Sequence, residues 1–376
     1  MKKKTSYTFR KLINDIHLWL GLASGIVLFV VCLTGTVLTF EHEIKDFFAE
    51  EFKIEASNKK IAVSSLIKIL EEKEIGFVTG VTVPSENLEP YVFNIKKDLK
   101  ERRGSKVFVN PFNAEVKKVE KTSADAFLFS MFKLHRWLML DTNIGRPIVG
   151  VSTIIFLILS LTGIVLWFPR RVKLKNFKQG LKIKFNANWK RINHDLHNTL
   201  GFYACIFIVI MGLTGLCWSF EGYREGLSTV LGTKVFNRSS VKINADKISS
   251  DKMLNVDKLI ARANQTLDYK GELSVTFPSK RNNYYSFRKS DEASFSPVFT
   301  DKLYLDASGK VLAVDYFKDK PFNVKIASLI KPLHTGEIYG MFSKIIYFLA
   351  CLIATSLPVT GTIIWLNKLK KNKKKK

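Results

Sequence analysis

Long uncharged stretches alternate with polar segments along the chain. Each uncharged stretch is apolar and at least as long as the ~20 residues that a helix needs to cross the ~30 Å hydrocarbon layer of a membrane. A buried core helix would be shorter and would show a polar stripe. The pattern therefore predicts four transmembrane helices, over residues 18–40, 147–168, 200–220 and 345–366.

The polar segments that follow the first and third stretches have the pattern of small α+β domains. Each contains one run with helical periodicity and several short alternating runs that predict strands. The predicted helices cover residues 64–73 and 257–267. The predicted strands cover residues 80–83, 91–96, 106–109, 273–277, 284–288 and 302–305, and a further strand is expected after the turn at 306–309.

The net charge of +26 at pH 7 is concentrated in three short segments. Residues 1–16, 169–199 and 367–376 are dense in Lys and Arg, and their only acids are Asp15 and Asp195. Short basic segments stay on the cytoplasmic side of a membrane, so both termini and the middle loop are predicted to be cytoplasmic. The basic balance then reflects contact with the lipid bilayer, and it gives no support for a nucleic-acid partner.

The two halves of the chain share a pattern, which predicts an internal duplication. At one constant offset, His17 and Gly21 match His197 and Gly201, and the pair Thr34-Gly35 matches Thr214-Gly215. The second and fourth stretches also correspond, through His135 with His334 and through Thr162-Gly163 with Thr360-Gly361. Both halves have the same orientation, so the predicted repeat is parallel.

These patterns predict an α-helical integral membrane protein: a four-helix transmembrane bundle from a parallel internal duplication, with two α+β domains on the outer side. The first half comprises a cytoplasmic N-terminus at 1–17, a helix at 18–41, an outer domain at 42–134, and an outer His segment with its helix at 135–168. The second half comprises a basic cytoplasmic loop at 169–197, a helix at 198–220, an outer domain at 221–333, an outer His segment with its helix at 334–366, and a Lys-rich tail at 367–376.

This arrangement resembles the PepSY-associated transmembrane family of bacterial inner-membrane proteins. The residues that carry the resemblance are the segments at 17–21, 134–136, 197–201 and 333–336, together with the Thr-Gly pairs. The resemblance implies two periplasmic PepSY-like domains and a multi-pass location in the bacterial inner membrane. The family includes di-haem reductases of ferric siderophores and iron-uptake factors, and many members have no established activity.

Four of the six histidines occupy repeat-equivalent positions at helix ends. His17 and His197 form a predicted inner pair, and His135 and His334 a predicted outer pair. Imidazoles on facing helices are standard axial ligands of haem iron, so each pair is expected to hold one haem b. The alternative for any single helix-end histidine is an interfacial anchor. His194 is an alternative ligand or supporting group, and His42, between two glutamates, is expected to be solvated.

Each predicted membrane helix carries one Thr-Gly pair, whose glycines are Gly35, Gly163, Gly215 and Gly361. Each Thr-Gly pair lies at the opposite end of its helix from the histidine of that helix. It is therefore expected at the same membrane depth as the histidines of the other pair. A glycine would let a flat macrocycle approach the backbone, although small residues also serve helix packing. With straight helices the two sites would lie about 30–40 Å apart. A bend within residues 141–147 would shorten that distance.

The paired histidines and the family resemblance together favour one hypothesis. In it, the protein is a membrane reductase that carries electrons through two haems to a ferric siderophore in the periplasm. The sequence contains no GxGxxG dinucleotide fingerprint, so the donor is expected to be a quinol or a separate reductase. The alternative is a haem-free membrane scaffold whose outer domains bind or regulate a partner protein or a peptidase.

Overall fold

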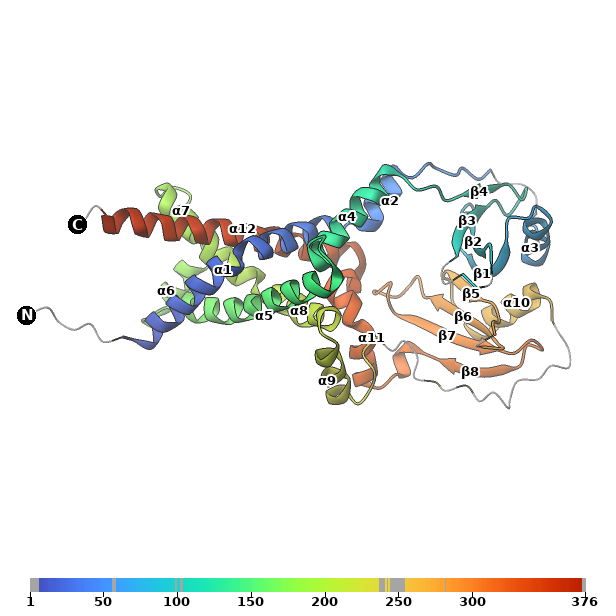
Figure 1. The fold of residues 1–376 in the computed structure, drawn as a ribbon. Coiled ribbons are helices and arrows are strands. Elements are labelled where there is room, and N and C mark those ends of the chain that lie inside the picture. Colours follow the sequence, from blue (N-terminus) through green and yellow to red (C-terminus); the bar gives the residue numbers. More distant parts are fainter. Residues whose placement is uncertain are drawn as a thin grey trace, which may run out of the picture. The chain divides into compact units, whose positions relative to one another are not determined.

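The computed structural model describes residues 7–55, 59–98, 100–101, 104–236, 241, 243, 254–280 and 282–373. The first six residues of the predicted N-terminus and the last three of the Lys-rich tail lie outside the described residues. The chain divides into two compact units (Figure 1). The membrane unit comprises Met1–Phe48, Ser123–Phe236 and Leu329–Lys376, and the sheet unit comprises Ala49–Thr122 and Asn237–Ser328.

The membrane unit is built on long apolar helices. These are α1 (Phe9–Leu38), α5 (Thr142–Trp167), α8 (Gly201–Ser219) and α12 (Gly340–Lys373). Within the described residues, four helical segments are long and apolar enough to cross a membrane. Helix α1 packs against α5 and α12, and α8 packs against the same two helices, which closes the bundle. Large apolar side chains such as Ile26 and Ile206 remain exposed on its surface, as lipid contact requires.

Two further helices, α4 (Ser123–Trp137) and α11 (Phe322–Thr335), carry the predicted outer histidines. Helix α4 packs along α1 and is joined to α5 by a tight turn in which Leu138 and Met139 have positive φ. A Cβ on Gly145 would clash with the Trp137 carbonyl oxygen, so the turn requires glycine there. In the second half, Gly336 and Gly340, both at positive φ, flank the short helix η4 (Glu337–Tyr339) between α11 and α12.

Shorter helices complete the membrane unit. They are α2 (Glu41–Phe48), α6 (Leu174–Gly180), α7 (Trp189–Asp195), the π-helix η1 (Leu196–Leu200) and α9 (Glu221–Leu231). Lys344 of α12 is only 6% exposed and donates to both carboxylate oxygens of Glu43 at 2.6 Å, which ties α2 to the bundle. The helices extend beyond the uncharged stretches: α1 begins at Phe9, nine residues before the predicted span, because polar side chains at its start do not interrupt helical hydrogen bonding.

The sheet unit contains one eight-stranded antiparallel sheet. Its strands are β1 (Phe77–Val83), β2 (Tyr91–Lys96), β3 (Ser105–Val109), β4 (Val116–Lys118), β5 (Leu273–Thr276), β6 (Tyr285–Ser290), β7 (Thr300–Leu305) and β8 (Val311–Asp315). The order is β4-β3-β2-β1-β5-β6-β7-β8. Helices α3 (Val63–Glu72) and α10 (Val256–Thr266) share one buried core with the sheet, and the short helix η3 (Phe317–Asp319) follows β8.

The two predicted α+β segments share a single sheet in the structure. Strand β1 of the first segment pairs with β5 of the second, with Val81 opposite Val275, and both side chains are buried in the shared core. Each segment alone would leave the backbone groups of this edge unpaired. Joining the two edges satisfies those groups and merges the two predicted domains into one unit.

The N-terminus of α3 is capped from the other half of the chain. Its own N-cap, Ala62, offers no side-chain acceptor, whereas Asp257 of α10 accepts from the backbone N–H groups of Val63 at 2.7 Å and Ser64 at 3.2 Å. The carboxylate satisfies two of the donors that every helix start leaves unpaired. This contact therefore holds the two segments together in addition to the β1–β5 pairing.

We expect Asp257→Ala to destabilise the start of α3 by about 1 kcal/mol, the usual cost of a lost cap. In the full-length protein, hydrogen exchange of the amides of residues 63–66 should accelerate several-fold. Glu272→Ala, which removes an exposed carboxylate in the same unit, serves as the control. Equal exchange rates in the two variants would show that Asp257 does not hold the two segments together.

Candidate functional site

The structure brings the four repeat-equivalent histidines together in two pairs. His17 of α1 faces His197 of η1 with 6.2 Å between ring centroids and 89° between ring planes. His135 of α4 faces His334 of α11, also with 6.2 Å between centroids and 61° between planes. These are the inner and outer pairs that the sequence predicts.

The other two histidines lie in different surroundings. The side chain of His42 is 70% exposed, and its Nε2 lies 4.0 Å from a Glu337 carboxylate oxygen. The side chain of His194 is 54% exposed, and its Nδ1 lies 3.6 Å from Asp195. His194 also lines the cavity beside the inner pair, but it has no ring contact comparable to those of the paired histidines among the described residues.

Every paired histidine rests against the Thr-Gly pair of a neighbouring helix. In each case the ring Nδ1 lies within hydrogen-bonding distance of the threonine Oγ1. The distances are 2.9 Å for His17 and Thr162, 3.3 Å for His135 and Thr34, 3.0 Å for His197 and Thr360, and 3.1 Å for His334 and Thr214.

A backbone carbonyl near each threonine determines the tautomer of the ring. His135 Nδ1 lies 2.8 Å from the Val31 carbonyl oxygen, and His334 Nδ1 lies 2.9 Å from that of Met211. The backbone of Leu159 lies near the ring of His17, and that of Leu357 near the ring of His197, at the equivalent positions. A carbonyl oxygen only accepts, so Nδ1 must carry the proton. The lone pair that can bind a metal is then on Nε2.

The threonine hydroxyls act as acceptors from the rings. Thr34 Oγ1 donates its single proton within its own helix, to the Val30 carbonyl at 2.7 Å, and the other three threonines bond their own helices in the same way. A hydroxyl that donates its proton elsewhere still accepts from an N–H group. The Nδ1–H of His135 and that of His334 are therefore each directed at a carbonyl and a hydroxyl on one helix face.

The glycines of the four pairs lie against the imidazole rings. A Cβ built on the glycine would meet the Cε1 atom of the facing ring, at 3.1 Å for Gly35 and His135, 3.5 Å for Gly163 and His17, 3.0 Å for Gly215 and His334, and 3.1 Å for Gly361 and His197. The sequence suggested that these glycines admit a macrocycle. In the structure, the group that approaches each glycine is the histidine ring.

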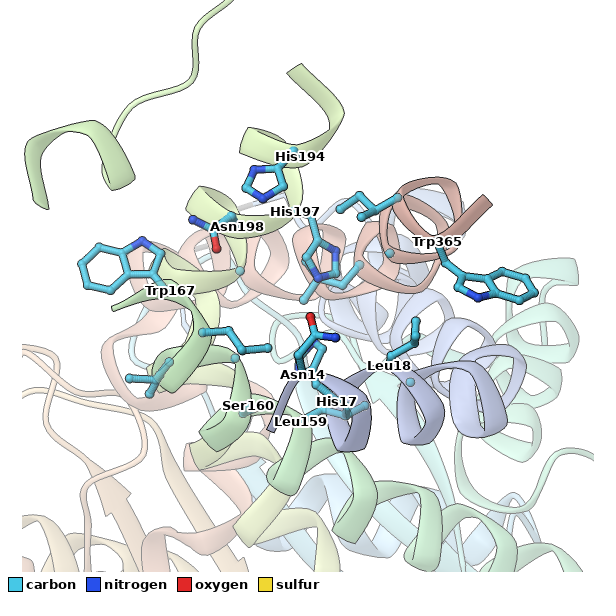
Figure 2. Close-up of a pocket in the computed structure, with 18 of the residues that line it drawn as sticks. Asn14, His17, Leu18, Leu159, Ser160, Trp167, His194, His197, Asn198 and Trp365 are labelled. Carbon is cyan, nitrogen blue, oxygen red and sulfur yellow. The ribbon is translucent and has the colours of Figure 1, made fainter. Parts of the chain in front are cut away.

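A cavity of about 630 Å³ opens beside the inner pair. Figure 2 shows His17 and His197 pointing toward each other inside it, with Trp167 and Trp365 on opposite sides. Most of its wall is apolar, and the polar residues Asn14 and Asn198 also line it. The cations on its lining are Arg10, Lys11, Arg170 and Lys368. The sequence reasoning missed Asn14, Asn198 and these cations as site residues, although Lys11, Asn14 and His17 follow helical spacing on one face.

The outer pair is enclosed by aromatic and apolar side chains. The Trp218 ring lies 5.2 Å from that of His334, and Trp218 packs with Cys217, Val235 and Ile330 in one buried cluster. Both outer histidines lie on α4 and α11, outside the four membrane-spanning segments. Burial lowers the pKa of His135 and lowers that of His334 to about 4, so both rings are neutral at pH 7.

The two pairs lie closer together than straight helices would place them. Because α4 turns back, His135 bonds the carbonyl of Val31, which is on the same helix as His17. The rise along α1 from His17 to Val31 is about 21 Å at 1.5 Å per residue. The tight turn that brings His135 back beside α1 lies at residues 138–141. It precedes most of the segment 141–147 where a bend was expected, because α5 is already helical from Thr142.

Within the part of the chain that the structure describes, no group of three or more His, Cys, Asp or Glu side chains could hold a metal ion. The four cysteines are free and buried. A closed zinc-type site needs four protein ligands. Two facing histidines do not by themselves make up such a site.

A family model supports the resemblance. None of the curated proteins matches this chain. The family model described as PepSY-associated TM region matches residues 15–368, a range that contains all four paired histidines and all four Thr-Gly pairs. It covers more than half of the chain, and the chain belongs to the PepSY-associated TM region family.

Proposed function

We propose that this protein is a di-haem electron conduit of a bacterial inner membrane, in which each histidine pair holds one haem b. The observation that carries the proposal is the spacing of the rings, with centroids 6.2 Å apart in both pairs. Two metal–nitrogen bonds of about 2 Å each, one to each ring, place two imidazole centres about 6 Å apart. With the proton on Nδ1, both rings of each pair also have an Nε2 lone pair that is available to bind iron.

The surroundings of the inner pair also suit a haem. A volume of about 630 Å³ lies within the range of cofactor sites, and its walls are mainly apolar. The propionates of a haem are anionic and need cations or water. Lys11, Arg170 and Lys368 on the cavity lining supply such cations. A bound haem would supply one-electron chemistry through its iron, while the chain orients the ligands and excludes water.

The positions of the two histidine pairs suit the transfer of electrons across a membrane. They lie on opposite parts of α1, about 21 Å apart along its axis. The acceptor we propose is a ferric siderophore in the periplasm, whose Fe(III) takes up one electron to become Fe(II). The donor is a quinol or a separate reductase, since the chain carries no dinucleotide fingerprint.

We further infer that the chain arose by a parallel duplication and that both its ends are cytoplasmic. The same sequence of contacts recurs in both halves, including the Thr-Gly pairs against histidines and the helices that turn back at 138–141 and 336–340. The basic segments favour a cytoplasmic location for the loop at 169–199. The sheet unit would then be periplasmic.

Purified protein should contain two haems per chain, seen as b-type absorbance. His17→Ala and His197→Ala should each remove the same inner haem, and His135→Ala and His334→Ala the same outer haem, because each iron needs both rings. His42→Ala is the control and should retain both haems, since its side chain is 70% exposed. His194→Ala tests the alternative ligand. Wild-type protein without haem would refute the proposal and leave the scaffold hypothesis.

The orientation can be tested by cysteine labelling from outside intact spheroplasts. Lys97→Cys and Asn282→Cys should react with an impermeant reagent, whereas Gln179→Cys should stay protected until the membrane is opened. The four native cysteines are buried, so they should contribute little background. Reaction of Gln179→Cys from outside would invert the proposed topology.

The place where electrons leave can be tested in reconstituted vesicles that contain a reductant. We expect His334→Ala to leave the inner haem reducible and to abolish reduction of an external ferric siderophore, because a polar chelate must accept electrons at the outer pair. His42→Ala should reduce the chelate at the wild-type rate. Normal reduction in the His334 variant would show that the outer pair is not the exit.

A further inference from the structure

We infer that the four Thr-Gly pairs are positioning residues that set the direction, tautomer and electron-donating strength of the haem-ligating imidazoles. The inference rests on the proposed function, because it assigns the histidines to haem iron. It assigns a role to Thr34, Thr162, Thr214 and Thr360, and it gives the adjacent glycines a new one. The argument depends on three features that recur at all four positions.

The first feature is that each histidine belongs to one helix and its ring is hydrogen-bonded by a threonine of another helix. Helix α5 holds His17 of α1, and α1 in turn holds His135 of α4. In the second half, α12 holds His197, and α8 holds His334. Each ring is therefore oriented within its own half of the chain, before it meets the ring of the other half. Each haem would therefore meet two preformed half-sites, one from each half of the chain.

The second feature is the position of the glycine relative to the accepting carbonyl. Gly35 lies four residues after Val31, and the same step separates Gly163 from Leu159, Gly215 from Met211 and Gly361 from Leu357. A helical side chain lies over the turn that precedes it, so residue i+4 normally covers the carbonyl of residue i. Glycine leaves that carbonyl open, and the ring Nδ1 can reach it.

Glycines outside these pairs have different neighbours, which separates this role from general helix packing. A Cβ on Gly21 would meet Leu159, one on Gly25 would meet Pro358, and one on Gly212 would meet Leu157. These are apolar side chains, as expected for close packing of membrane helices. The glycines of the Thr-Gly pairs meet imidazole Cε1 atoms instead.

The third feature is the threonine hydroxyl, which gives each Nδ1–H a second acceptor. An acceptor at Nδ1 makes the imidazole a stronger electron donor at Nε2. A stronger donor stabilises Fe(III) and lowers the reduction potential of a haem. Because each threonine serves one ring, the potentials of the two haems can be changed separately.

The threonine test uses Thr360, which serves His197 of the inner pair. Redox titration of the purified full-length protein, followed by absorbance, should show that Thr360→Val raises the potential of the inner haem and leaves that of the outer haem unchanged. Its haem affinity should fall by about tenfold, as for other supporting partners of metal ligands. Thr360→Ser, which keeps the hydroxyl, should restore both values.

The glycine test compares two variants at the same inner haem that should differ in the size of their effect. Gly361→Ala brings a Cβ to 3.1 Å from His197 and must push the ring, whereas Gly163→Ala brings one to 3.5 Å from His17, an ordinary contact. Low-temperature electron paramagnetic resonance reports the mutual orientation of the two axial rings. The inner-haem spectrum should change more in Gly361→Ala than in Gly163→Ala, because only the first variant also presses on the ring.

The outcomes separate this inference from the proposed function. Wild-type protein without haem would end both. Haem-loaded wild type, together with a Thr360→Val variant of unchanged inner potential or two glycine variants with identical spectra, would end the positioning role alone. If Thr360→Val lost its haem completely, recovery of haem and potential by Thr360→Ser would support the inference, and continued loss in Thr360→Ser would contradict it.

Discussion

The hydrogen bond from a histidine Nδ1–H to a helix carbonyl is the interaction on which the rest of the membrane unit depends. A buried ring N–H needs an acceptor, and inside an apolar bundle the available acceptors are mostly carbonyls already used by helices. The Thr-Gly pair provides one: glycine uncovers the carbonyl, and threonine adds a hydroxyl whose own proton is already bonded. Where Val31, Thr34 and Gly35 receive His135, all three groups come from one turn of α1.

This requirement explains the irregular backbone between the paired helices. For His135 to reach the outer part of α1, the chain must reverse before α5, and it does so with Leu138 and Met139 at positive φ. That conformation is costly for residues other than glycine. The Asp141 side chain offsets part of the cost by capping α5 through the Asn143 N–H. The second half achieves the same reversal with Gly336 and Gly340, where positive φ costs little.

Hydrophobic patterning could predict the helical membrane class, and the matched spacing of histidines could indicate which rings would pair. The pattern could not show that β1 and β5 join, because an alternating strand looks the same whether its edge is free or paired. The pattern also could not assign the role of the glycines. Gly35 and Gly361 were interpreted as space for a macrocycle, because a sequence does not show which group occupies the space beside a glycine. The cations at the inner cavity, such as Lys368, were hidden among the basic residues expected at any cytoplasmic helix end.

The two halves are held together differently in the two units, and this bears on how the proposed cofactor acts. In the sheet unit, the β1–β5 ladder and the Asp257 cap join the halves directly. In the membrane unit, each histidine is held by a helix of its own half, and the facing rings lie 6.2 Å apart. An iron coordinated by both Nε2 atoms would link the halves at those points. Ligand binding adds stability to whichever state binds it. Haem would therefore stabilise the assembled bundle, and its loss would weaken the contact between halves without removing the local hold on either ring.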